Sequence, residues 1–201
     1  MKRTVALMAV LLVAMLGYAA DSAMAAYKAK VDHGTLAAES AAPQTSPGDA
    51  IDPRTYDPDS RLFLVAHATG TQKYTCQTNG TWLFTDPEAT LYTTDASKPI
   101  GTHFLNFATG RPVWQLKDGS SVEAARKAAQ PAGTENIAWL LLQAADTAVG
   151  SDGDRLAATT WVQRLNTSGG VAPAGTCTPG DLTAVPYTAD YLFWRAARGD
   201  A

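Results

Sequence analysis

The chain has 201 residues, 46% of them hydrophobic, which is enough for one domain with a core of its own. Its 16 basic and 19 acidic residues give a formal net charge of −3. No run of more than two Lys or Arg residues occurs; the adjacent pairs are Lys2-Arg3 and Arg126-Lys127. This argues against nucleic acid or an anionic membrane as a partner, because either would need a clustered basic face.

The first 25 residues have the pattern of a secretory signal peptide. Lys2-Arg3 precedes an apolar run from Val5 to Leu16, and small residues follow as far as Ala25. The run is shorter than the roughly 20 residues that span a bilayer. We therefore expect cleavage after Ala25, no stable membrane insertion afterwards, and a periplasmic or extracellular location. Cleavage leaves 14 basic and 18 acidic residues, a net charge of −4.

Residues 26–60 are rich in Ala, Ser, Pro, Asp and Gly, and four prolines interrupt any periodicity. We interpret this stretch as a flexible lead-in with local turns at Asp52-Pro53 and Asp57-Pro58. Order is expected to begin near Tyr56 or Arg61. A single β-rich domain then covers residues 61–195, and a tail covers residues 196–201.

From Arg61 onward, turn signals recur about every ten residues between short strand-like runs, as in a sandwich or barrel. Breaks are expected at Thr69-Gly70 and Asp86-Pro87, among others. The expected strands cover residues 62–66, 72–77, 81–84, 89–93, 100–107, 112–117, 156–165 and 185–194. We predict an all-β, single-domain fold: a β-sandwich, with a partly open β-barrel as the alternative, and at most one or two short helices.

Two stretches could form either a helix or a strand. Residues 122–130 favour a helix by propensity, with a cap at Ser120 or Ser121. Residues 136–145 are compatible with a buried helix or with a strand buried on both faces, which periodicity does not separate.

Asn79-Gly80 is the strongest hairpin signal in the chain, because both residues tolerate the positive φ of a type I′ turn. A two-residue loop there places Cys76 opposite Leu83. The only other cysteine is Cys177, and two cysteines in an exported chain favour a disulfide over a metal site or reactive thiols. The bond would close a loop of about 100 residues. By lowering the conformational entropy of the unfolded chain, it would stabilise the fold by about 4–5 kcal/mol.

Several segments together resemble a family of exported bacterial and fungal proteins catalogued as a domain of unknown function. They include Tyr74-Thr75-Cys76, Gly101-Thr102-His103, Gln163-Arg164-Leu165-Asn166-Thr167 and Tyr187-Thr188-Ala189-Asp190-Tyr191, within residues 61–194. The resemblance implies a strand over residues 122–130. It implies no established activity, and although some fungal members carry the label malate dehydrogenase, the chain lacks the Gly-x-Gly-x-x-Gly of a nicotinamide site.

No pattern of catalytic or metal-binding residues stands out. The three histidines lack the spacing of metal ligands, and no Gly-x-Ser-x-Gly elbow occurs. We therefore expect no metal and no cofactor, and we assign no catalytic residue.

Four residues are candidates for ligand binding: His103, Asp118, Arg164 and Asn166. His103 shares a strand face with Leu105, a position that more often holds a core histidine. Its partner on the next strand depends on the loop at Thr109-Gly110: a two-residue loop places His103 opposite Leu116, whereas a bulge shifts the register.

Arg164 and Asn166 alternate onto one face and could bind an anion or a carbohydrate. The alternative is that Arg164 pairs with an acidic neighbour and Asn166 closes a turn.

Two functional hypotheses follow. The first is a monomeric, non-enzymatic binding or envelope-associated module for a small molecule or polymer. The second is a secreted enzyme that uses His103, Asp118 and Arg164 as acid, base and anion clamp. Convergence of His103 and Arg164 on one cleft would favour the second.

Overall fold

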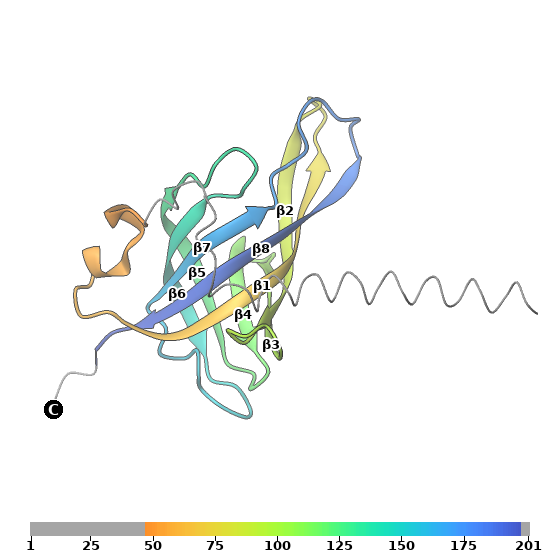
Figure 1. Cartoon of the computed structure of the whole chain (residues 1–201). Helices are drawn as coiled ribbons and strands as arrows, with labels where there is room; N and C mark the ends of the chain where they lie inside the picture. Colours follow the sequence, from red (N-terminus) through yellow and green to blue (C-terminus); the bar gives the residue numbers. More distant parts are fainter. Residues whose placement is uncertain (1–46, 198–201) are drawn as a thin grey trace, which may run out of the picture. The chain divides into compact units, whose positions relative to one another are not determined.

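The computed structural model describes residues 47–197 and shows a closed, antiparallel barrel of eight strands in chain order (Figure 1). The expected signal peptide, residues 26–46 of the expected lead-in and residues 198–201 lie outside the described residues. The strands are β1 Arg61–Cys76, β2 Trp82–Tyr92, β3 Pro99–Asn106, β4 Arg111–Leu116, β5 Ser121–Gln130, β6 Trp139–Ala148, β7 Trp161–Gly169 and β8 Leu182–Arg195.

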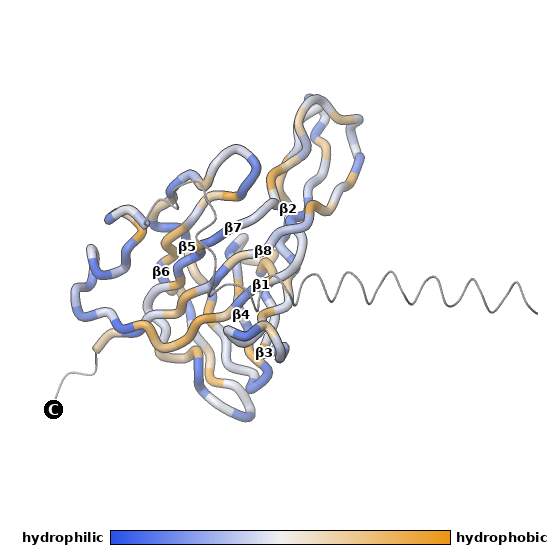
Figure 2. The backbone as a smooth tube through the Cα atoms, viewed as in Figure 1, coloured by the Kyte–Doolittle hydropathy of each residue, from blue (hydrophilic) through white to orange (hydrophobic). Residues whose placement is uncertain are grey.

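The all-β prediction is confirmed, and the chain adopts the barrel alternative in place of the favoured sandwich. The barrel is closed, not partly open, because β1 pairs with β8 along almost its whole length, from Arg61 opposite Arg195 to Thr75 opposite Leu182. Hydrophobic and hydrophilic residues alternate along the strands (Figure 2), as expected for a wall with one inner and one outer face.

The two expected breaks in β1 and β2 are wrong. Gly70 lies inside β1, between Ala89 of β2 and Tyr187 of β8, where a side chain would collide with the β2 backbone. Pro87 lies inside β2 opposite Gln72, two residues after a bulge at Thr85 of the same strand. The β2–β3 ladder begins only at Ala89, so the missing N–H of Pro87 interrupts no bond there.

Both ambiguous stretches are strands, β5 and β6. Ala124 is fully buried inside the barrel and pairs with Ala144 of β6. The pairing of β5 with both β4 and β6 outweighs the helix propensity of its alanines. The strand expected from Leu156 begins later, at Trp161. Leu156 instead lies in a turn that buries its side chain among the interior residues.

The loop between β1 and β2 is one residue longer than predicted. Cys76 lies opposite Trp82, not Leu83, and the N–H of Gln77 donates to the carbonyl of Thr81. Asn79 accepts hydrogen bonds from Thr81 through its side chain, and Gly80 has a φ of 76°. Three loop residues with glycine in the left-handed position form the common bulged hairpin.

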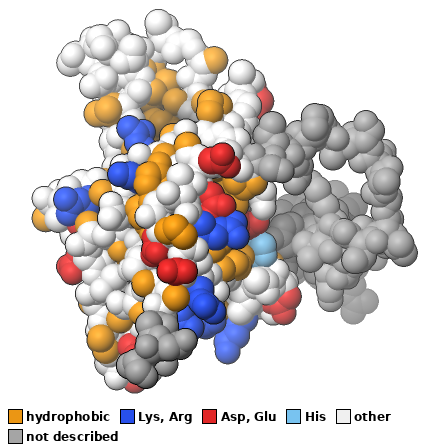
Figure 3. Space-filling view, turned by 90° about the vertical axis from the view of Figure 1, so that its left-hand side faces the viewer, with side chains coloured by type: hydrophobic (Ala, Val, Ile, Leu, Met, Phe, Trp, Pro, Cys, Tyr) orange, Lys and Arg blue, Asp and Glu red, His pale blue; other side chains and the backbone are white. Residues whose placement is uncertain are grey.

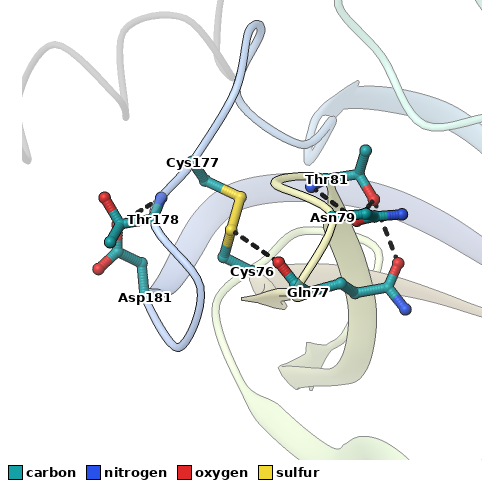
Figure 4. The surroundings of a disulfide bond; sticks show 7 residues. All are labelled: Cys76, Gln77, Asn79, Thr81, Cys177, Thr178 and Asp181. Atoms are coloured by element: carbon teal, nitrogen blue, oxygen red, sulfur yellow. Dashed lines mark hydrogen bonds between the residues drawn. A yellow bond between two sulfur atoms is a disulfide. The ribbon is translucent and has the colours of Figure 1, made fainter.

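The disulfide joins the end of β1 to the loop before β8 (Figure 4). The Cα atoms of Cys76 and Cys177 are 5.8 Å apart, within the range that a disulfide requires. Asp181 accepts from the N–H of Thr178 and closes the loop around the second cysteine. The bond thus ties the β1–β2 hairpin to the start of β8.

A second apolar cluster lies on the outside of β6, β7 and β8, beneath two short 3-10 turns, η1 Asp49–Ile51 and η2 Pro53–Thr55. Ile51 is fully buried there among Trp139, Trp161 and Trp194. Gln163 donates to the carbonyl of Ile51 at 2.6 Å. Residues 47–60, assigned above to the lead-in, therefore form an ordered cover. Neither 3-10 turn has the length of a membrane span, and residues 47–197 contain no other helix.

Candidate functional site

A cavity of about 580 Å³ occupies one end of the barrel interior. All eight strands contribute to its wall, together with the connections β3–β4 and β5–β6. It runs from an exposed rim at Phe84, Arg111 and Arg126 to a floor at Trp114 and Tyr191, each 1% exposed. Packed side chains, among them Leu116 and Phe193, fill the opposite end of the barrel.

The floor is built around His103. The β3–β4 loop has four residues, so His103 lies opposite Trp114, not Leu116, and both side chains point inward. Their rings stack with centroids 4.5 Å apart and planes 8° apart, and Tyr191 lies against both at 5.0 and 5.2 Å. Leu105 shares the inward face as predicted, through the period-two alternation of the strand.

His103 is a neutral imidazole with a fixed tautomer. Its Nδ1–H donates to the carbonyl of Val113 at 2.8 Å, since a carbonyl oxygen can only accept. Burial lowers the pKa of His103 to about 3, and the positive charge of Arg164 lowers it as well. Nε2 is therefore left as a hydrogen-bond acceptor, and the ring adds no positive charge to the cavity at neutral pH.

This burial predicts a loss of stability in mild acid. The unfolded chain takes up a proton at His103 near pH 6.5 and the folded chain only near pH 3, so falling pH favours unfolding across that window. Between pH 7 and pH 5 we expect the free energy of unfolding to fall by about 2 kcal/mol through this residue. Urea unfolding of the wild type and of His103→Phe at both pH values measures the difference. Equal losses in the two proteins would contradict the assignment, because all other titrating groups are shared.

The tyrosines round the cavity are held as neutral phenols. Burial raises the pKa of Tyr191 and of Tyr187, whose hydroxyl oxygens lie 3.4 Å apart, while the Arg164 charge acts in the opposite direction on both. Burial also raises the pKa of Tyr74, whose hydroxyl donates to the carbonyl of Gly170 at 2.6 Å. These groups offer hydrogen bonds to a ligand but no negative charge.

Arg164 brings a cation into the cavity from β7. Its cross-strand neighbours, Leu140 on β6 and Tyr191 on β8, line the same cavity. Among the described residues Arg164 takes part in no ion pair, so the acidic neighbour weighed above is not found there. His103 and Arg164 thus converge on one cavity.

Asp118 lies away from this cavity, in the turn between β4 and β5 at the filled end of the barrel. Its Oδ1 accepts from the N–H and the hydroxyl of Ser120, and its Oδ2 accepts from the N–H of Arg155. Burial alone would raise the pKa of Asp118, but these hydrogen bonds hold it below its usual value. The carboxylate therefore closes a turn and reaches neither His103 nor Arg164.

Asn166 faces the outside of the barrel, so its predicted common face with Arg164 is wrong. Its φ of 50° breaks the alternation, and the β7–β8 register shifts just after Leu165. Its side chain donates to Asp190 at 2.8 Å, and Asp190 also contacts His67. Asn166 tolerates this left-handed conformation, as asparagine often does.

Two residues of the cavity floor, Trp114 and Tyr191, were not among the site residues predicted from the sequence. The alternation of Tyr187, Ala189, Tyr191 and Phe193 onto one face of β8 was the available signal for Tyr191, since all four are buried. Barrel closure gives that face a shared interior with β3 and β4, a relation that no local pattern contains.

The charges that line the cavity are all positive. Arg111, Arg126 and Arg164 take part, and none of the described lining residues is Asp or Glu. Elsewhere the signs are mixed, and on the face in Figure 3 acidic and basic side chains are interspersed. Within residues 47–197 no group of three or more His, Cys, Asp or Glu side chains is placed to hold a metal ion.

Comparison with known proteins yields one match. A family model described as "Protein of unknown function (DUF3455)" matches residues 57–195, nearly the range over which the sequence showed its resemblance. No curated protein and no solved structure matches the chain.

Proposed function

The chain belongs to the DUF3455 family of proteins of unknown function, and we propose that it binds a small, largely apolar molecule inside its barrel. The observation that carries this proposal is the cavity of about 580 Å³. Its volume lies in the range of ligand pockets, which span about 300–1,000 Å³, and such pockets combine apolar walls with a few polar groups. Here the apolar walls include Leu105, Leu140 and Leu142.

Binding without catalysis fits the chemistry of the lining residues. The lining includes no Ser, Thr, Cys, Asp or Glu side chain among the described residues, so a nucleophile of the Ser, Thr or Cys type and a carboxylate base are both lacking there. The enzyme alternative retains the convergence of His103 and Arg164 but loses its proposed base, because Asp118 lies at the other end of the barrel. One chain encloses the cavity, so a monomer suffices for binding.

The disulfide indicates a non-cytoplasmic location, where such bonds persist. Together with the expected signal peptide it supports a periplasmic or secreted binding protein, acting on a molecule that reaches the cell envelope or the medium. The N-terminus of the native protein, read by mass spectrometry, tests export directly.

A neutral fluorescent probe tests the proposed function. N-phenyl-1-naphthylamine, which brightens in apolar surroundings, should bind the wild type saturably. Leu140→Trp fills the cavity and should weaken binding at least tenfold. Leu62→Trp, the same exchange at an exposed position near the filled end, serves as the control and should bind like the wild type. Equal binding by the two variants, or no saturable binding by the wild type, would contradict the proposal.

A further inference from the structure

Arg164 lies where a cation is unexpected. It projects inward from the middle of β7, half-buried, between Leu140 and Tyr191. Its charge acts on the buried groups around it, since it opposes the burial-induced rise in the pKa of Tyr191 and of Tyr187. A charge in such surroundings is costly unless hydrogen bonds and an opposite charge compensate for it.

The hydrogen bonds of Arg164 satisfy only one side of its guanidinium. Nε and Nη2 both donate to the carbonyl of Ala138, at 3.0 and 2.8 Å. The other three N–H groups, including the end-on pair formed by Nη1 and Nη2, make no further hydrogen bond of ordinary geometry among the described residues, although the Tyr191 hydroxyl lies close enough to interact with the guanidinium. The end-on pair is the fork that binds a carboxylate with two parallel hydrogen bonds. The carbonyl of Ala138 thus fixes the plane of the guanidinium and leaves its outer edge for a ligand.

Two other arginines of the described residues have counter-charges within the protein, and the remaining four, Arg61, Arg126, Arg155 and Arg195, are exposed to solvent. Arg54 pairs with Asp52 at 2.8 Å, and Arg111 at the rim pairs with Glu123 at 3.4 Å. No acidic residue of the described part pairs with Arg164 or lines its cavity. Arg126 at the rim adds a further positive charge along the entrance, which favours the approach of an anion.

We infer that the ligand is an apolar monocarboxylate whose acid group pairs end-on with Arg164 while its apolar body fills the cavity toward the rim. This inference rests on the proposed function, since it assigns a chemical class to the molecule in the same cavity. Among residues 47–197, the neutral His103 and the neutral tyrosines leave Arg164 as the only charge on the inner part of the wall. A bidentate, charge-assisted pair is among the stronger polar contacts in proteins.

A matched pair of probes separates the acid group from the apolar body. Fluorescent cis-parinaric acid and the corresponding alcohol share one chain, and the wild type should bind the acid at least tenfold more tightly at pH 7. Arg164→Gln should remove that preference, leaving the alcohol within twofold of its wild-type affinity. Arg164→Lys keeps the positive charge but loses the forked pair of N–H donors, so it should retain part of the preference for the acid over the alcohol. Arg155→Gln makes the same charge change at the filled end of the barrel and should alter neither affinity.

The outcomes distinguish the two proposals. Binding of both probes with equal affinity by the wild type, or an unchanged preference in Arg164→Gln, would overturn the carboxylate assignment while leaving apolar binding intact. Failure of both probes and of N-phenyl-1-naphthylamine to bind the wild type would overturn the proposed function and this inference with it. If Arg164 serves only to hold Ala138, Arg164→Gln should lower the midpoint of urea unfolding and weaken both probes alike, which would also overturn the assignment.

Discussion

Replacing Cys76 and Cys177 together by serine is expected to lower the free energy of unfolding by about 4 kcal/mol. The bond spans 101 residues, so its loss frees a long loop in the unfolded chain, and the chain-entropy model assigns about 4.7 kcal/mol to a loop of that size. In the folded state the loop before β8 stays held by backbone hydrogen bonds to Gly80 and Cys76. The folded state therefore gains little conformational entropy to offset the loss. Urea unfolding of the oxidised wild type and of the double variant measures the loss.

The single variants decide whether the bond itself is responsible. Each serine replacement alone breaks the same bond, so Cys76→Ser and Cys177→Ser should lose similar amounts, and the double variant should be little worse than either. Cys76 is buried and Cys177 only half-buried. Unequal losses that add up in the double variant would show instead that each sulfur contributes through local packing.

Replacing Gly70 by alanine is expected to destabilise the barrel by about 3 kcal/mol or more, at the upper end of the effects of overpacking. A Cβ at this position would lie 2.0 Å from the carbonyl oxygen of Glu88 and 2.5 Å from Cα of Ala89. Both atoms belong to the β2 backbone, which cannot move without disturbing its ladder with β1. Chemical or thermal unfolding of the purified variant gives the value.

Gly48→Ala is the matched control for this prediction. Gly48 has an ordinary φ of −69°, and an added Cβ would meet only the flexible end of the Gln130 side chain, at 3.1 Å. We expect its unfolding midpoint to stay close to that of the wild type. Similar midpoints for Gly48→Ala and Gly70→Ala would mean that β1 and β2 do not approach as closely at Gly70 as described.

Sequence patterns predicted the structure correctly where the rule depends only on residues close together in the chain. Period-two alternation placed His103 and Leu105 on one face, and the turn signals predicted an all-β chain. The cysteine count predicted the pairing of Cys76 with Cys177, which the structure places at bonding distance. Alternation placed Arg164 on a common face with Asn166, but nothing local showed that Arg164 points inward or that His103 lies across the same interior.

The errors arose where tertiary contacts override a local signal. Asn79-Gly80 fits a two-residue loop, yet Asn79 uses its side chain to cap a three-residue loop. This shifts the partners of Tyr74, Thr75 and Cys76 by one place, and the register shift between Lys73 and Tyr74 restores the expected pairing beyond it. Thr69-Gly70 resembles a turn, whereas the glycine is required by the close approach of a neighbouring strand. At Asn166 a left-handed residue turned the side chain away from the ligand cavity, and the amino-acid type alone does not indicate when that conformation is used.

The pairing of β1 with β8 sets the order in which the protein can be completed. These are the first and last strands, so Arg61 meets Arg195 only after the whole domain has been synthesised. Such distant contacts fold slowly, because the chain loses the entropy of a long loop before the contacts stabilise it. Until β8 arrives, β1 and β7 present unpaired edges that can join another chain, and the interior cavity has no wall on that side. Completion of the binding site and protection from edge-to-edge aggregation are therefore the same late event.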